Sequence, residues 1–135
     1  MKVQCNTEDR MVATGEKPRV LVVDDEQVIA NTLAQILNQS GFAATVAYSG
    51  EKAIEMAPGL CPDILISDVV MFGMTGVDVA LAVTRSQPAC RVVLFSGQAA
   101  TADLLRRAEE QGCHFEILAK PVHPRTLLNV LRKVN

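Results

Sequence analysis

Short apolar runs separated by helix-length segments constrain the fold of this chain most. They lie at 20–23, 64–66, 92–95 and 115–118, with a weaker run at 43–48 that includes Thr45. A run without any polar residue, such as 20–23, is typical of a strand buried on both faces of a parallel sheet, whereas 43–48 suits an edge strand. The runs start every ~20–28 residues, about the length of one βα unit.

Amphipathic segments fill the spaces between these runs, with apolar residues at helical spacing. The stripes are Ile29, Leu33, Ile36 and Leu37, stopped by Gly41; Val77, Ala80, Leu81 and Thr84; Leu104, Leu105 and Ala108, stopped by Gly112; and Leu127, Leu128, Leu131 and Val134, begun by Pro124. A further short helix is expected from the N-cap Ser49 through Met56, before Pro58. The alternation predicts an α/β fold of the (βα)5 type, a doubly wound five-stranded parallel sheet with helices on both faces.

Length and composition limit the protein class. The 135 residues make one ordinary domain, and the hydrophobic share of 49% is too high for a disordered chain. No apolar run approaches the ~20 residues of a membrane-spanning helix, and residues 1–17 lack the apolar stretch of a signal peptide. We therefore predict a cytoplasmic protein with a flexible leader at 1–17, one folded domain at 18–135 and no membrane partner.

Charge and cysteine content exclude two further classes. The net charge of −2 and the lack of a basic stripe argue against direct nucleic-acid binding. Cys5, Cys61, Cys90 and Cys113 lie far apart, without a CxxC spacing or a Cys/His cluster, so a zinc-type site is not expected. In a reducing compartment these cysteines are predicted to be free thiols.

Polar residues follow four of the runs, at the carboxyl ends of the predicted strands, where a parallel sheet places its ligand site. Asp24, Asp25 and Glu26 follow the first run, Asp68 the third, Ser96 the fourth and Lys120 the fifth. Each residue alone would most simply cap a helix or form a turn. Together they predict the three aspartates Asp24, Asp25 and Asp68, a hydroxyl and an ammonium group at one edge of the sheet.

This set of groups suits phosphoryl chemistry. Carboxylates held close repel one another unless a cation joins them, and an incomplete all-oxygen ligand set suits Mg²⁺, which shares its other positions with water and phosphate. Mg²⁺ and Lys120 would neutralise a transferring phosphoryl group while Ser96 hydrogen-bonds one of its oxygens. A carboxylate remains as the attacking group, which would give an acyl phosphate.

The motifs resemble the receiver (CheY-like) domain of two-component response regulators. The matching segments are VLVVDDE at 20–26, DILISDVVMFGMTGVD at 63–78, VVLFSG at 92–97 and LAKPV at 118–122. The resemblance covers about residues 18–135. It implies a flavodoxin-like or CheY-like three-layer αβα sandwich.

The resemblance also assigns the site residues. Asp68 corresponds to the phosphoacceptor, which shares the Mg²⁺ ion with Asp25. Asp24 would act largely through a metal-bound water, and the backbone carbonyl of Val70 would supply another ligand. Lys120 matches the lysine that pairs with the phosphoryl group, in a Lys-Pro peptide bond that is expected to be cis.

Departures from the family pattern concern the loop and the switch. Phe72 stands four residues after Asp68, where the family usually has proline. The switch hydroxyl is Ser96 in place of the commoner threonine. The switch aromatic corresponds to Ile117, an aliphatic residue, and Phe115 lies on the same side of that strand but at a different height.

Two further positions tune how long the phosphoryl group lasts in this family. They lie two residues beyond the phosphoacceptor and two beyond the switch hydroxyl, here Val70 and Gln98. Val70 can neither orient a water nor accept its proton, and Gln98 is neutral and cannot act as a base. A rather long-lived phosphoryl group is therefore expected.

The resemblance implies a signalling module that catalyses its own phosphoryl transfer and autodephosphorylation, and is not otherwise an enzyme. Its phosphodonor would be a sensor histidine kinase or a phosphotransfer protein, and its 99–134 surface would dock a downstream protein or a second copy. A flavodoxin-like domain that binds FMN or a nucleotide would need a Ser/Thr/Gly-rich loop at 24–26. An aspartyl phosphatase would usually carry its nucleophile after the first strand.

Overall fold

The computed structural model describes residues 17–97 and 101–133, so the predicted leader lies outside it apart from Lys17. The strands are β1 (Arg19–Val23), β2 (Ala43–Ala47), β3 (Ile64–Asp68), β4 (Arg91–Ser96) and β5 (Glu116–Ala119). The helices are α2 (Gln27–Gln39), α3 (Gly50–Leu60), α4 (Gly76–Ser86), α5 (Thr101–Glu110) and α6 (Pro124–Arg132). In the described ranges, no helix is long and apolar enough to cross a membrane.

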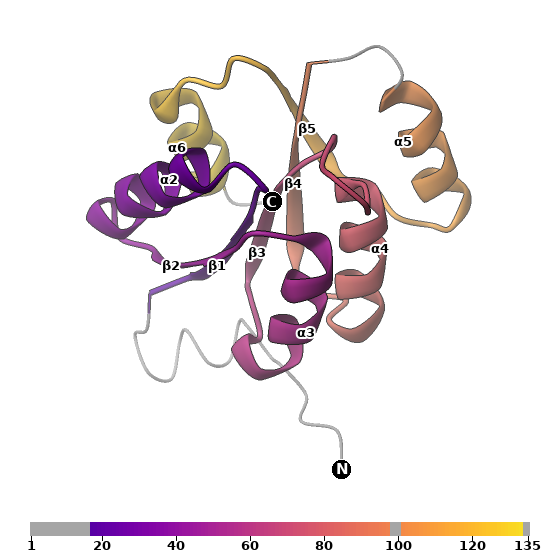
Figure 1. The fold of residues 1–135 in the computed structure, drawn as a ribbon, viewed down its shortest axis with the longest axis horizontal. Coiled ribbons are helices and arrows are strands. Elements are labelled where there is room, and N and C mark those ends of the chain that lie inside the picture. The colour runs from indigo at the N-terminus through magenta and orange to yellow at the C-terminus, as the bar shows by residue number, and fades with distance from the viewer. Residues whose placement is uncertain (1–16, 98–100, 134–135) are drawn as a thin grey trace.

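All five strands are parallel and form one sheet in the order β2-β1-β3-β4-β5. The order reverses at β1, so the chain winds first one way and then the other across the sheet. α2 and α6 cover one face, and α3, α4 and α5 cover the other (Figure 1). The predicted doubly wound (βα)5 sandwich is confirmed.

The core lies on both faces of the sheet because side chains of a strand alternate between them. Val20 and Val22 of β1 pack with residues of α2 and α6, while Leu21 and Val23 pack on the other face. Each of these four side chains is at most 1% exposed. With both faces covered by helices, the loops at the carboxyl ends of the strands remain for a site.

The two outer strands are less buried than the central three. β2 has exposed and half-buried positions, as predicted for an edge strand. β5 forms the other edge and alternates between half-buried and exposed residues, which fits the presence of Glu116 in its apolar run. The most buried strands therefore lie at the centre of the sheet.

α3 runs further than its sequence pattern predicts. Ser49 caps its N-terminus as expected, but the helix continues past Pro58 and does not end at Met56. A proline in the last turn removes one backbone donor, which a helix end tolerates better than its interior. The N–H of Cys61 still donates to the Ala57 carbonyl and closes the helix.

The cysteines divide into two groups. Cys90 and Cys113 carry free thiols, as predicted. Burial raises the pKa of the Cys90 thiol to about 12, so this side chain stays protonated and inert. Cys61, half-buried at the end of α3, is disulfide-bonded, and the prediction of a free thiol is wrong for this residue.

Candidate functional site

The sheet brings the predicted polar residues to one edge. Asp24 follows β1 directly, Asp68 ends β3, Ser96 ends β4 and Lys120 follows β5. β1, β3, β4 and β5 are consecutive neighbours in the sheet, and their register aligns these ends. The N–H of Lys120 donates to the carbonyl of Ser96 at 3.0 Å, which continues the strand pairing into the site.

An ion pair lies at the centre of this edge. Nζ of Lys120 is 2.6 Å from Oδ2 of Asp68, although the two residues are 52 positions apart. Asp68 is buried, and its Oδ1 accepts a longer hydrogen bond, 3.4 Å, from the N–H of Val70. The Lys120-Pro121 peptide bond is cis, as the resemblance implied. The structure thus places Lys120 against Asp68, the predicted phosphoacceptor.

Asp24 lies deeper than its neighbour Asp25. It is 6% exposed, and its Oδ1 accepts a 2.9 Å hydrogen bond from the N–H of Glu26. Burial raises the pKa of the Asp24 carboxyl. The negative charges of Asp68 and Asp25 raise that pKa further, whereas the Glu26 N–H and the Lys120 ammonium act in the opposite direction. This edge therefore carries more negative charge than its cation balances.

Asp25 is exposed and faces a different loop. Its Oδ2 accepts a 2.8 Å hydrogen bond from the main-chain N–H of Phe72, in the loop between β3 and α4. Within the part of the chain that the structure describes, no three His, Cys, Asp or Glu side chains are grouped so that they could hold a metal ion as they stand. The three carboxylates share an edge but form no ready-made cage.

The loop after Asp68 is fixed at its far end by α4. The N–H of Gly76 donates to the Val69 carbonyl at 2.8 Å, and a Cβ at position 76 would lie 2.2 Å from the Asp68 carbonyl oxygen. Thr75 and Asp78 form a reciprocal capping box at the start of α4. The missing side chain of Gly76 therefore lets a helix begin directly against the end of β3.

The predicted switch and tuning residues differ in exposure. Ser96 is buried at the end of β4, Ile117 is 36% exposed on β5, and Phe115 packs at half-burial against the core of α3, α4 and α5. Val70 is 52% exposed beside Asp68. Gln98 lies outside the described residues, so its tuning role stays a prediction.

Comparison with known families identifies the family of this chain. The family model of the response regulator receiver domain matches residues 20–132. This chain belongs to the response regulator receiver domain family. The match spans every strand and helix of the sandwich except Arg19 at its start, so the predicted resemblance is confirmed for the whole described fold.

Curated relatives of this receiver domain are longer proteins. A cyclic di-GMP phosphodiesterase of Thermotoga maritima is 30% identical over 77% of this chain and 27% of its own length. The DNA-binding response regulator MtrA of Mycobacterium tuberculosis is 29% identical over 86% of this chain and 50% of its own length. The chain thus spans between about a quarter and a half of these relatives.

Solved structures agree on the fold. The chemotaxis response regulator CheY4 of Vibrio cholerae matches with a TM-score of 0.74 at 27% identity, over 86% of this chain and 97% of that one. A CheY-like receiver domain protein of Methanospirillum hungatei matches with a TM-score of 0.79 at 21% identity, over 87% and 92% of the two chains. The receiver domain here is therefore a two-component signalling module with a CheY-like fold.

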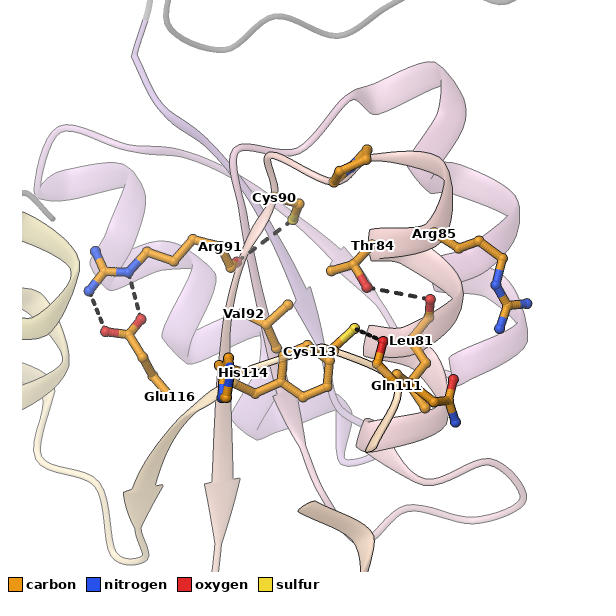
Figure 2. A pocket seen from close by; sticks show the side chains of 13 residues that line it. Leu81, Thr84, Arg85, Cys90, Arg91, Val92, Gln111, Cys113, His114 and Glu116 are labelled. Carbon is orange, nitrogen blue, oxygen red and sulfur yellow. Dashed lines mark hydrogen bonds and ion pairs between the residues drawn. The ribbon is translucent and has the colours of Figure 1, made fainter. Parts of the chain in front are cut away.

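The opposite, amino edge of the receiver sheet holds a different kind of hollow. A cavity of about 470 Å³ lies between the end of α4, the start of β4 and the α5–β5 loop, and its wall includes Leu81, Val92 and Cys113 (Figure 2). Glu116 is the one carboxylate of its lining, and it forms an ion pair with Arg91. This cavity therefore lacks the group of carboxylates found at the carboxyl edge.

Proposed function

We propose that this receiver domain accepts a phosphoryl group on Asp68 from a phosphohistidine of a sensor histidine kinase or a phosphotransfer protein. The contact of Asp68 with Lys120 at 2.6 Å, beside two further carboxylates, carries this proposal. A buried carboxylate whose one oxygen is fixed by an ammonium group is oriented for in-line attack on phosphorus by the other oxygen. The phosphorylated domain then changes which protein it binds.

The transfer uses the residues of this edge in distinct roles. An oxygen of Asp68 forms a bond to phosphorus while the bond between phosphorus and the imidazole nitrogen of the donor breaks, and that nitrogen takes up a proton. The ammonium group of Lys120 offsets the charge of the phosphoryl oxygens. The hydroxyl of Ser96, buried at the end of the neighbouring strand, hydrogen-bonds one of them.

The carboxyl edge fits Mg²⁺ by its chemistry. Its donors are oxygens, which suit a hard cation, and three carboxylates share this edge with the one ammonium group of Lys120. Asp24, Asp25, Asp68 and the backbone carbonyl of Val70 would hold the ion. When bound, Mg²⁺ supplies positive charge that neutralises the phosphoryl oxygens during transfer.

A docking surface beside the site supports a protein phosphodonor. A largely apolar hollow of about 670 Å³ lies between α2 and the β5–α6 loop, and its lining includes Val28, Ile29, Asp24 and Lys120. Val28 and Ile29 are exposed, at 79% and 46%. We assign this surface to the donor and the rest of the 99–134 surface to a downstream protein or a second copy. A cytoplasmic location and the lack of direct nucleic-acid binding are part of the same proposal.

The proposal limits this chain's chemistry to its own phosphoryl transfer and autodephosphorylation, with no other enzyme activity. A flavodoxin-like cofactor site is disfavoured by the acidic groups at the end of β1. The side chain of Asp24 is buried there, and a carboxylate in the place of a phosphate loop repels a phosphate group.

Phosphorylation with a small donor tests the proposal. Incubated with acetyl phosphate and Mg²⁺, the protein should gain one phosphoryl group, detected by intact-protein mass spectrometry. Asp68→Asn should abolish this gain, because the amide is nearly isosteric but lacks the anionic oxygen needed for attack. Asp103→Asn, on the exposed face of α5, is the matched control and should be phosphorylated at the rate of the unmodified protein.

Two results would contradict the assignment. Phosphorylation of the Asp68→Asn variant at full rate would place the acceptor elsewhere. Failure of the unmodified protein to become phosphorylated, with the fold intact by circular dichroism, would remove the proposed activity. Yellow colour and flavin absorption in the purified protein would favour the flavodoxin-like alternative.

A further inference from the structure

A hydrogen bond from a main-chain N–H to a side-chain carboxylate crosses the mouth of the site. Oδ2 of Asp25 accepts from the N–H of Phe72 at 2.8 Å, across 47 positions of sequence. It joins the loop after β1 to the loop after β3. The ring of Phe72 is 92% exposed, so the ring itself is not packed into the fold. Phe72 therefore contacts the rest of the site through its main-chain N–H.

The position of that amide is determined by its neighbours in the loop. Met71, directly before it, is buried in the core cluster under α3 and α4. Gly73, directly after it, has a φ of +85°, a left-handed conformation that glycine adopts without strain. Because both flanking residues are constrained, the N–H of Phe72 is held in place by the loop and does not follow the motion of its own ring.

The carboxylate of Asp25, in contrast, has little to hold it. The residue is exposed and lies between β1 and α2. Asp24 and Asp68 place two further carboxylates at the same edge of the sheet, and repulsion between like charges pushes an exposed carboxylate outward. A fixed donor on one of its oxygens opposes that displacement.

We propose that the main-chain N–H of Phe72 is a positioning group for the metal ligand Asp25. It fixes one carboxylate oxygen so that the other is presented to the cation. Carboxylates that bind metals are typically held by a further hydrogen bond, and losing it weakens metal affinity. This inference rests on the proposed function, because it takes Asp25 to be a ligand of Mg²⁺.

Two variants at one position separate the amide from the ring. Phe72→Pro removes the N–H and keeps an apolar side chain, since proline has no backbone donor. Phe72→Ala keeps the N–H and removes the ring. Proline is the usual residue of the family here, so Phe72→Pro tests only the donor that this chain has added. Mg²⁺ affinity of the full chain, measured by isothermal titration calorimetry with MgCl₂, should fall several-fold in this variant. It should stay within about twofold in Phe72→Ala, because backbone amides are unchanged there.

A second measurement needs neither metal nor a proline. In the ¹⁵N-labelled protein without Mg²⁺, Asp25→Ala removes the acceptor, so the amide proton of Phe72 should lose its hydrogen bond and shift upfield. The amide of Val70, whose acceptor is Asp68, serves as the internal control and should shift much less. This measurement keeps the inference testable even where the proline variant folds poorly.

The outcomes separate this inference from the proposed function. Equal Mg²⁺ affinity in Phe72→Pro and Phe72→Ala, with wild-type protein binding Mg²⁺ and accepting phosphate, overturns the positioning role alone. An unmoved Phe72 amide in Asp25→Ala does the same. Absence of Mg²⁺ binding in the wild-type protein overturns the magnesium site of the proposed function and, with it, the role given to Phe72.

Discussion

The two edges of the receiver sheet use similar charged residues in opposite ways. At the amino edge, Arg91 donates to both carboxylate oxygens of Glu116, at 2.6 and 2.7 Å, and Asp63 accepts a 2.7 Å bond from the N–H of Arg19. At the carboxyl edge, three carboxylates face one ammonium group, and burial together with like charge raises the pKa of Asp24. Charge is balanced internally at one edge and left in excess at the other.

The balanced edge also ties down the end of the chain's last helix. The guanidinium of Arg91 donates to the carbonyls of Val130, Leu131 and Lys133, at 2.7, 3.2 and 3.2 Å. Leu131 and Lys133 lie at the end of α6, where carbonyls lack intrahelical partners, and the Val130 carbonyl also accepts from the N–H of Lys133. The hydrogen bond of the guanidinium with Glu116 raises the pKa of Arg91 above its usual value. The amino edge thus pairs its charged groups with one another and with main-chain carbonyls, whereas the carboxyl edge keeps three carboxylates around one ammonium group.

Removing Arg91 should show the largest difference between the edges. Arg91→Ala removes the donor that Glu116 shares with three main-chain carbonyls in and after the last turn of α6. The free energy of unfolding should therefore fall by about 2–3 kcal/mol. Arg106→Ala, which breaks an exposed pair with Asp103, is the control and should cost about 0.5 kcal/mol or less. Urea denaturation monitored by circular dichroism measures both variants.

The same variant tests whether the edges are separate. Folded Arg91→Ala should accept phosphoryl from acetyl phosphate at the wild-type rate, because Arg91 lies at the far end of β4 from Ser96. A loss of stability no larger than that of Arg106→Ala would show that the amino-edge network contributes little. A slowed phosphorylation in the folded variant would show that the two edges are coupled.

Neutralising Asp24 should have a smaller effect of opposite sign. Because the pKa of Asp24 is raised on folding, the folded state keeps a proton at pH values just above 3.8, where the unfolded state has lost it. The free energy of unfolding therefore falls as pH rises from about 3.8 through the folded-state pKa. Asp24→Asn keeps an acceptor for Glu26 and removes the charge. Without Mg²⁺ at pH 7, it should raise the free energy of unfolding by about 1 kcal/mol.

Two conditions check the cause of that gain. Below pH 3.8 the gain should disappear, since Asp24 is then neutral in both states. With saturating Mg²⁺ the order should reverse, because the cation stabilises the fold that binds it and the variant has lost a carboxylate at the site. A variant that is less stable than wild type at pH 7 without Mg²⁺ would mean that the Asp24 charge is already balanced.

The carboxyl edge was largely predictable because its residues follow strand ends. Asp24, Asp68, Ser96 and Lys120 are placed by a topology that buried apolar runs already specify, and the lysine indeed meets Asp68. The extent of α3 was not predictable in this way. A proline shows where a helix loses one donor, but it does not show that the next residues continue the helix to Leu60, which the structure reveals.

The contacts that the sequence did not reveal are those made by main-chain groups or by isolated ionic residues. The bond from the Phe72 N–H to Asp25 has no side-chain pattern, and the role of Gly76 depends on how closely α4 approaches β3. Arg91 and Glu116 each stand alone at a strand start. Pairing them requires the register of β4 and β5, which local periodicity does not specify.

The smallest expected effect concerns the lifetime of the phosphoryl group and the exposed residue Val70 at the carboxyl edge. Val70 is 52% exposed beside Asp68, and its stiff β-branched side chain offers the hydrolytic water no hydrogen bond. Val70→Asn supplies one, worth on the order of 1 kcal/mol in the transition state, so hydrolysis should accelerate several-fold. Phosphate release is followed in both proteins after the donor is removed. Equal or slower decay in the variant would mean that the side chain of residue 70 faces away from the path of the water.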